Sequence, residues 1–208
     1  MADLMIPCFV EDDAHRAFFD ALLARLSAEE GWGPRVVRAE FRSSAHGRGA
    51  AMSALERYLR DARVGRAPVQ PLLVILVDGN CERSASRKRA ILRLAGAQGF
   101  PADAVVVGVP DPHIERWLLD GQALKAGVDP KIAVHVPKHK CERNRYKSAL
   151  REAFRGADIH PPAGGVEYSA DIVPHLDLER PGCGDSALKV FADDLRAALR
   201  RLRGSGAA

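Results

Sequence analysis

Side chains that are mostly acidic follow three apolar segments of this 208-residue sequence, each at the point where the apolar segment ends. They are Glu11 after residues 4–10, Asp78 with Asn80 after residues 71–77, and Asp111 with Glu115 after residues 104–109. Oxygen donors of this kind suit the hard cations Mg²⁺ and Mn²⁺. Such an ion can bridge phosphate oxygens and position a water for hydrolysis. The pattern therefore predicts a metal site, provided that the fold brings the three turns together.

The hydrophobic pattern predicts the elements that would position these acids. Short apolar runs at 4–10, 71–77 and 104–109, and a segment at 35–41 in which apolar and charged residues alternate, indicate strands. Each is followed by an expected helix, at 17–26, 83–96, 113–119 and 52–59 respectively. This alternation predicts an α/β fold, a Rossmann-like parallel sheet with helices on both faces. The run 71–77 is almost wholly aliphatic and is expected to be the central strand. Ligands of parallel sheets bind outside the carboxyl ends of the strands, where all three acidic turns would lie.

The chain is long enough for one substantial domain with an appended segment. We expect the α/β domain at residues 1–120 and a C-terminal helical elaboration, packed on the same domain, at 121–203. Within the elaboration, residues 127–140 are loop-like, 143–154 form a basic amphipathic helix and 188–202 form a closing helix. Residues 204–208 are expected to be a disordered tail.

Charge, cysteine spacing and hydropathy exclude several classes of protein. Lysine and arginine exceed aspartate and glutamate by 31 − 27 = 4, an excess too small to demonstrate an anionic partner. Cys8, Cys81, Cys141 and Cys183 are far apart without a CxxC pair, so neither a zinc ribbon nor a secreted disulfide scaffold is expected. No signal-peptide pattern is found, and no apolar run approaches the roughly 18 residues that span a bilayer. These features predict a cytoplasmic protein that is not embedded in a membrane.

A purely structural interpretation of the acids competes with the metal site. Asp and Asn after a strand are common turn formers and helix caps, so each residue taken alone is more often a cap than a ligand. Three acidic turns at one end of a sheet are harder to explain in this way. Their like charges would repel one another unless a cation neutralised them.

Three motifs in order resemble the Toprim fold. They are Phe9-Val10-Glu11 before a helix, Val77-Asp78-Gly79-Asn80 after the aliphatic run, and Ile114-Glu115-Arg116-Trp117-Leu118-Leu119. The last is similar to the IExWLL stretch of small bacterial Toprim-like proteins of anti-phage systems, including relatives of the OLD-family nuclease domain. The resemblance covers residues 4–120 well and the remainder only loosely.

The resemblance implies roles for individual residues. Glu11 matches the glutamate that binds metal or serves as general base, Asp78 and Asn80 match the Asp-x-Asp metal ligands, and Glu115 matches the acidic residue of IExWLL. Asn80 replaces an aspartate, which removes one negative charge. His15 stands where OLD-like nucleases often have a second carboxylate, and it either ligates a metal, Mn²⁺ in particular, or faces solvent from its helix.

A basic segment is the candidate for contacts to nucleic acid. Its positive side chains surround one aromatic residue, Tyr146, and they are Lys138, Lys140, Arg143, Arg145 and Lys147. Such a surface can track a phosphate backbone, although a solvated helix face explains it equally well. If the metal site is real, a lysine of this segment, Lys140 or Lys138, is expected to neutralise charge that develops on a phosphate, which is a catalytic role.

Two functions are consistent with these features. The first is a metal-dependent nuclease acting on DNA or RNA, with Mg²⁺ or Mn²⁺ as cofactor, in bacterial anti-phage defence as the resemblance implies. The second is a noncatalytic Toprim-like scaffold that binds nucleic acid or a partner protein of a defence system. A homo-oligomer is compatible with both.

Overall fold

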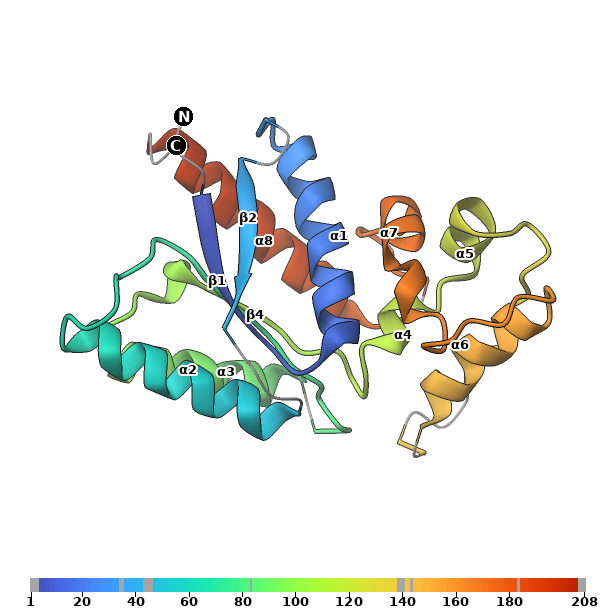
Figure 1. Cartoon of the computed structure of the whole chain (residues 1–208), viewed down its shortest axis with the longest axis horizontal. Coiled ribbons are helices and arrows are strands. Elements are labelled where there is room, and N and C mark those ends of the chain that lie inside the picture. Colours follow the sequence, from blue (N-terminus) through green and yellow to red (C-terminus); the bar gives the residue numbers. More distant parts are fainter. Residues whose placement is uncertain are drawn as a thin grey trace.

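Four short parallel strands form the centre of the computed structural model, which describes residues 4–33, 36–42, 47–82, 84–137, 141–142, 144–182 and 184–205. The strands are β1 (Leu4–Val10), β2 (Val37–Phe41), β3 (Leu73–Leu76) and β4 (Val105–Gly108). Their order in the sheet is β2-β1-β3-β4, and every neighbouring pair is parallel. Figure 1 shows β2 beside β1. The predicted Rossmann-like α/β class is therefore confirmed, with β1 and β3 inside the sheet and β2 and β4 at its edges.

Helices cover both faces of the sheet. The helices α1 (Asp13–Glu29) and α8 (Ser186–Gly204) pack on one face, and α2 (Arg48–Arg63) and α3 (Ser84–Ala97) pack on the other. Side chains of a strand point alternately to the two faces, so every residue of β3 is buried, as its aliphatic sequence predicts. On β4, a Cβ at Gly108 would lie 2.6 Å from the Leu76 side chain and 2.9 Å from the Phe191 ring, so glycine lets α8 pack closely there.

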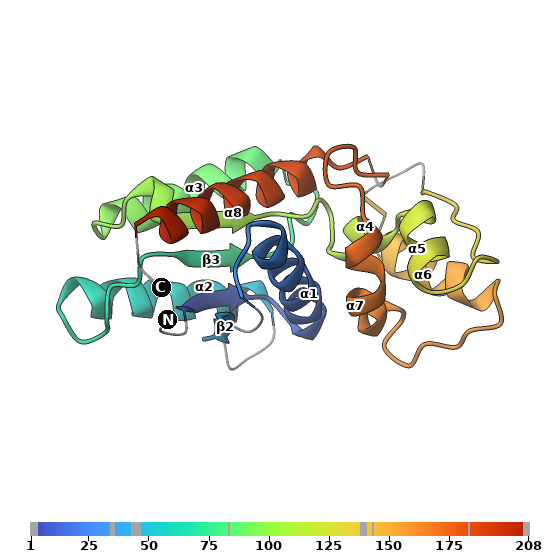
Figure 2. The ribbon, with the colours of Figure 1, turned by 90° about the horizontal axis from the view of Figure 1, so that it is seen from above.

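A second group of short helices lies beyond the carboxyl ends of the strands (Figure 2). It contains α4 (Glu115–Leu118), α5 (Gly121–Gly127), α6 (Arg145–Arg155) and α7 (Ser169–Ile172), with the 3₁₀ turns η2 (Val166–Tyr168) and η3 (Val173–His175). The guanidinium of Arg25 on α1 donates to the carbonyl oxygens of Val173 and Leu176, both at 2.8 Å, which ties this group to the sheet domain. A further 3₁₀ turn, η1 (Ala102–Ala104), precedes β4.

The C-terminal half follows the predicted pattern in part. The basic helix is present as α6 and the closing helix as α8, whose Phe191, Leu195 and Leu199 are buried against the core. Helix α5 has no counterpart in the prediction, and the helix expected at 113–119 is only the single turn α4. Of the predicted tail, residues 206–208 lie outside the described residues. Among the helices described, none is both long and apolar enough to cross a membrane.

Candidate metal centre

The junction between β1 and α1 presents three polar side chains in a short span. Strand β1 ends at Val10, and Asp12 is the N-cap of α1, where its carboxylate accepts a hydrogen bond from the His15 backbone N–H at 3.1 Å. This cap satisfies one of the unpaired N–H groups of the first helical turn. It also fixes the backbone that carries Glu11 on one side and His15 on the other.

Asp78 reaches the same place from β3. Its side chain is buried, and its backbone N–H donates to Glu11 Oε2 at 3.0 Å. The next residue, Gly79, donates to the Pro110 carbonyl at 2.7 Å, and a Cβ on Gly79 would lie 2.9 Å from that oxygen. Glycine therefore allows the loops after β3 and β4 to pack together. The structure thus brings the predicted residues Glu11 and Asp78 side by side.

His15 is fully buried and does not face solvent from its helix, as one interpretation of the sequence had it. Its Nδ1 lies 2.7 Å from Asp12 Oδ1, and its Nε2 lies 3.0 Å from Asp78 Oδ1. Burial lowers the pKa of the imidazole, but the hydrogen bonds to Asp12 and Asp78 outweigh it and raise the pKa to about 9. Burial raises the pKa of the Asp12 carboxyl group, but its hydrogen bonds to His15 outweigh burial and lower this pKa to about 2.

Asp78 has further partners on its other side. His113 Nδ1 lies 2.9 Å from Asp78 Oδ2, and the Ile114 backbone N–H donates to Oδ1 at 3.0 Å. Burial raises the pKa of Asp78, but its hydrogen bonds to His113 and His15 outweigh this and lower it. The hydrogen bond to Asp78 also raises the pKa of His113. The repulsion expected among the acids is thus relieved by two histidines, of which sequence reasoning missed His113, although it directly precedes the IExWLL stretch.

One ligand atom from each of Glu11, His15 and Asp78 lies within 4.8 Å of the other two, which suits a single divalent cation. A carboxylate bonded to one ring nitrogen of a histidine orients the other nitrogen toward a metal, and Asp12 stands in that position toward His15. The donors are two carboxylates and an imidazole. This mixed set fits Mn²⁺ better than Mg²⁺, which favours oxygen ligands and bound water.

The other predicted ligands lie outside this trio. Asn80 is exposed in a left-handed conformation with a φ of 49°, and its backbone N–H donates to the Pro112 carbonyl at 2.9 Å. Asp111 donates its backbone N–H to Asp185 Oδ2 at 3.1 Å. Glu115 is buried close to Asp78, and burial raises the pKa of its carboxyl group. Its Oε2 has no hydrogen-bond partner within the part of the chain that the structure describes.

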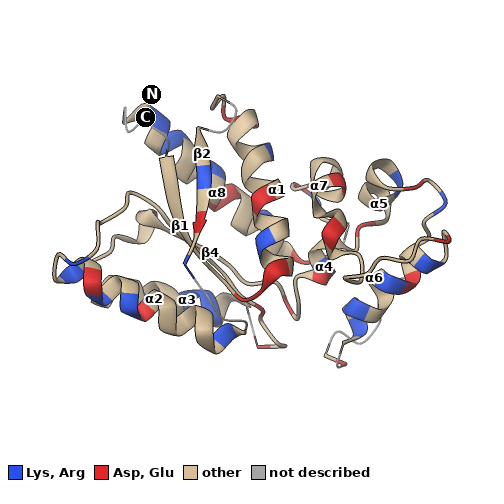
Figure 3. Ribbon diagram, viewed as in Figure 1, with Lys and Arg blue, Asp and Glu red and all other residues tan. Residues whose placement is uncertain are grey.

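Residues of the basic helix α6 and three acidic residues line a common cleft of about 270 Å³. The acidic residues are Asp12, Asp13 and Glu115, and the basic residues are Lys147 and Arg151. Lys147 Nζ lies 3.6 Å from Glu115 Oε1. Figure 3 shows lysine and arginine recurring along α6, and acidic residues where β1 leads into α1.

Of the other basic residues predicted to contact nucleic acid, the structure describes only one. Arg145 begins α6 and pairs with Glu142 at 2.9 Å. Lys138, Lys140 and Arg143 lie outside the described residues, so the catalytic role expected of Lys140 stays a prediction.

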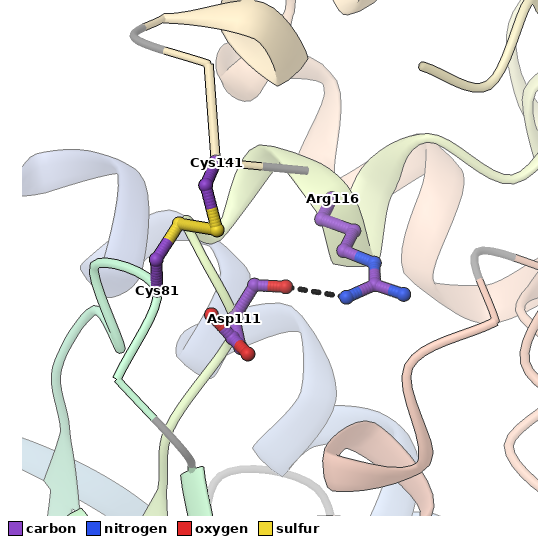
Figure 4. Close-up of a disulfide and its surroundings, with 4 residues drawn as sticks. All are labelled: Cys81, Asp111, Arg116 and Cys141. Carbon is purple, nitrogen blue, oxygen red and sulfur yellow. Dashed lines mark hydrogen bonds between the residues drawn. A yellow bond between two sulfur atoms is a disulfide. The ribbon is translucent and has the colours of Figure 1, made fainter. Parts of the chain in front are cut away.

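A disulfide connects the loop after β3 to the segment before α6 (Figure 4). Cys81, three residues after Asp78, is bonded to Cys141, which precedes α6, and their Cα atoms are 5.6 Å apart. The disulfide is not predicted from the sequence, because the two cysteines are far apart in it. Cys81 and Cys141 become neighbours only when the segment before α6 packs against the loop after β3. Arg116 donates to the Asp111 carbonyl oxygen beside the disulfide. The fold thus fastens the loop of Asp78 to the segment that leads into the basic helix.

Comparison of the chain with protein-family models, with curated proteins and with solved structures finds no match. The resemblance to the Toprim fold therefore stays a prediction that rests on the three sequence motifs.

Proposed function

We propose that the protein is a metal-dependent phosphodiesterase that acts on DNA or RNA, with Mn²⁺ or Mg²⁺ at Glu11, His15 and Asp78. The observation that carries the proposal is the convergence of these three donors from two strand ends, with Asp12 bonded to the far nitrogen of His15. A divalent ion held there supplies Lewis acidity to a phosphoryl group and activates water.

The chain's own residues account for the other requirements of a nuclease. Lys147 and Arg151 are four residues apart on α6, hence on one face of the helix, and both line the cleft that Asp12 and Glu115 also line. Cationic side chains in such a cleft can bind the phosphates that flank a scissile bond. Glu115 is a buried carboxyl group that lines the cleft, and burial raises its pKa, which makes it the candidate general acid.

A second candidate function, a noncatalytic scaffold for nucleic acid or a partner protein, has its own support. Both carboxylate oxygens of Asp78 already accept hydrogen bonds, from His15, His113 and the Ile114 backbone. A protonated His15 between Asp12 and Asp78 is a complete structural network that needs no ion. In this alternative the network fastens β1, β3 and the loop after β4 together, and α6 is a binding surface only.

The two functions differ in what added metal does. In the nuclease, Mn²⁺ raises the melting temperature by several degrees, because a ligand that binds only the folded state stabilises it. The same ion supports cleavage of labelled single- or double-stranded DNA or RNA. Glu11→Gln abolishes both effects, whereas Glu56→Gln, at an exposed position of α2, leaves both intact. Absence of any Mn²⁺-dependent stabilisation of the wild-type protein would favour the scaffold.

A further inference from the structure

The edge strand β2 has an unpaired side. In β2 the residues bonded to β1 are the even-numbered ones, since the Leu4 N–H donates to the Val36 carbonyl at 2.7 Å and the Arg42 N–H donates to the Cys8 carbonyl at 2.9 Å. Both polar groups of a strand residue point to the same side, and the side alternates along the strand. The N–H and C=O groups of Val37, Ala39 and Phe41 therefore point away from the sheet. Within the described part of the chain, β2 pairs with β1 alone.

Beside this edge lies an apolar groove of about 720 Å³ between β2 and α1. Leu23, Trp32 and Val37 contribute to its lining, together with Ser27. Trp32 and Ser27 are each only 7% exposed, yet Trp32 Nε1 and Ser27 Oγ have no partner in the described part of the chain. Buried polar atoms are rarely left unpaired. The groove and the open edge thus form one continuous surface that is suited to a further strand.

The sequence of β2 is complementary to itself. It reads Val37-Arg38-Ala39-Glu40-Phe41, with a positive and a negative residue placed symmetrically about Ala39. Antiparallel pairing of two copies about Ala39 sets Arg38 opposite the partner's Glu40, and Val37 opposite the partner's Phe41. Cross-strand pairs of opposite charge stabilise a sheet, whereas like charges in the same positions destabilise it.

The hydrogen-bonding register agrees with this charge pattern. With Ala39 opposite the partner's Ala39, the outward N–H and C=O groups of Val37, Ala39 and Phe41 all find partners on the second strand. Arg38 and Glu40 then occupy the non-hydrogen-bonded positions, where opposing side chains approach most closely. Val37, Ala39 and Phe41 pack toward the α1 face, so the partner's Phe41 would meet the groove near Val37 and Trp32.

We propose that the protein forms a symmetric dimer through antiparallel pairing of two β2 edges, which joins the two four-stranded sheets into one continuous sheet. An isologous contact of this kind needs one self-complementary patch, and the five residues of β2 supply it. Pairing also covers an open edge that would otherwise invite nonspecific association. Figure 2 shows β2 at the border of the sheet, and β4 forms the opposite edge. The dimer is independent of the proposed phosphodiesterase activity.

Charge reversal tests the register directly. Sedimentation velocity of the wild-type protein over a wide range of concentration should show a dimer. Glu40→Arg sets two arginines opposite each other at both ends of the pairing, and Arg38→Glu sets two glutamates there, so each should weaken dimerisation about tenfold or more. The double variant Arg38→Glu/Glu40→Arg restores opposite charges and should restore the dimer.

Two further variants complete the experiment. Glu56→Arg makes the same change of charge at an exposed position of α2 and should leave the dimer intact. Ala39→Pro removes an outward N–H, which an edge strand tolerates, and should give a folded monomer by circular dichroism. A wild-type protein that stays monomeric at high concentration overturns the proposal. Single reversals that behave like Glu56→Arg, or a double variant that stays as weak as the single ones, also overturn it.

Discussion

Asp78 and Glu115 lie at the same end of the sheet and are equally buried, each with 6% of its surface exposed, yet their surroundings shift the two pKa values in opposite directions. Asp78 accepts hydrogen bonds from His15, His113 and a backbone N–H, which lower its pKa in spite of burial. Glu115 has one cation at 3.6 Å, and burial raises its pKa. Hydrogen-bond donors, rather than depth of burial, therefore decide the direction in which the pKa of a buried carboxyl is shifted.

The largest expected effect is that of Asp78→Asn. The variant retains the shape of the side chain but removes the charge that compensates two histidines. Removing one partner from a buried charged network costs about 2–4 kcal/mol, so urea unfolding in EDTA should show a loss of that size. Mn²⁺-dependent cleavage should be abolished. Asp171→Asn, at an exposed position of α7, is the matched control and should change neither measurement.

Unchanged stability of metal-free Asp78→Asn would contradict the description of Asp78 as a neutralised anion, whatever its effect on cleavage. Loss of cleavage with unchanged stability would leave Asp78 as a ligand without a structural role. The two measurements therefore separate the metal site from the hydrogen-bond network.

The next effect is a dependence of stability on pH. His15 has its pKa raised from 6.5 to about 9, so the folded state favours the charged imidazole. The resulting stabilisation is complete below pH 6.5 and is lost as the pH rises to about 9. Its size is on the order of 2 kcal/mol, because each unit of pKa corresponds to about 1.4 kcal/mol and strongly coupled groups share the effect. Urea unfolding in EDTA across this range measures it.

His15→Gln should flatten the alkaline part of that pH profile. The acidic part depends on Asp12, whose lowered pKa of about 2 gives stability that is present above pH 3.8 and lost as the pH falls through about 2. A variant that retained the full alkaline loss would show that another group titrates there.

A smaller effect is expected from Asp12→Asn, which tests the positioning role of Asp12. Asparagine caps a helix as well as aspartate does, so the start of α1 is preserved. The charge that orients His15 is lost, and removal of such a partner typically weakens metal binding 10–100-fold. Stability in EDTA should fall by about 1 kcal/mol. Titration of the melting temperature with Mn²⁺ measures the affinity, and an unchanged affinity would show that Asp12 does not position His15 for metal binding.

The sheet could be predicted from the sequence because its signals are local. Residues 71–77 are aliphatic since both faces of β3 are covered, and the acids that end β1 and β3 mark the carboxyl edge of the sheet. Those two features were sufficient to place Glu11 and Asp78 together. The pattern of residues 188–202 likewise predicted α8, because a single apolar stripe packs on the core.

The rest of the site depends on contacts that sequence spacing does not encode. His15 is buried because the loop after β3 covers the first turn of α1, and His113 reaches Asp78 because Gly79 lets two loops pack together. Cys81 and Cys141 are 60 residues apart, and only the folded position of α6 makes them neighbours. Asn80 matches a ligand by motif, but the left-handed backbone at this position places it on the surface.

Glu115→Gln should act in the opposite direction from Asp78→Asn. A carboxyl whose pKa is raised by burial is destabilising when charged, so a neutral amide of the same shape relieves that cost. The contact with Lys147 is lost, but half-exposed lysines contribute little. Stability near neutral pH in EDTA should be unchanged or raised by up to about 1 kcal/mol. A marked loss would show that Glu115 is charged and paired in the folded protein.

The smallest expected effect is that of Asn80→Gly. This variant tests whether Asn80 is a metal ligand, as the sequence motif implies, or an exposed turn residue, as in the structure. Asn80 has a positive φ, a conformation that glycine adopts without strain, whereas Asn80→Ala would add about 1 kcal/mol of backbone strain. Glycine removes the amide group and preserves the turn, including the hydrogen bond from the Asn80 N–H to the Pro112 carbonyl. Because the side chain is exposed and outside the trio of Glu11, His15 and Asp78, the Mn²⁺-dependent rise in melting temperature should equal that of the wild type. A lost or much reduced rise would mean that Asn80 turns inward to bind the ion, as the Asp-x-Asp resemblance implies, and that the loop after β3 rearranges when metal binds.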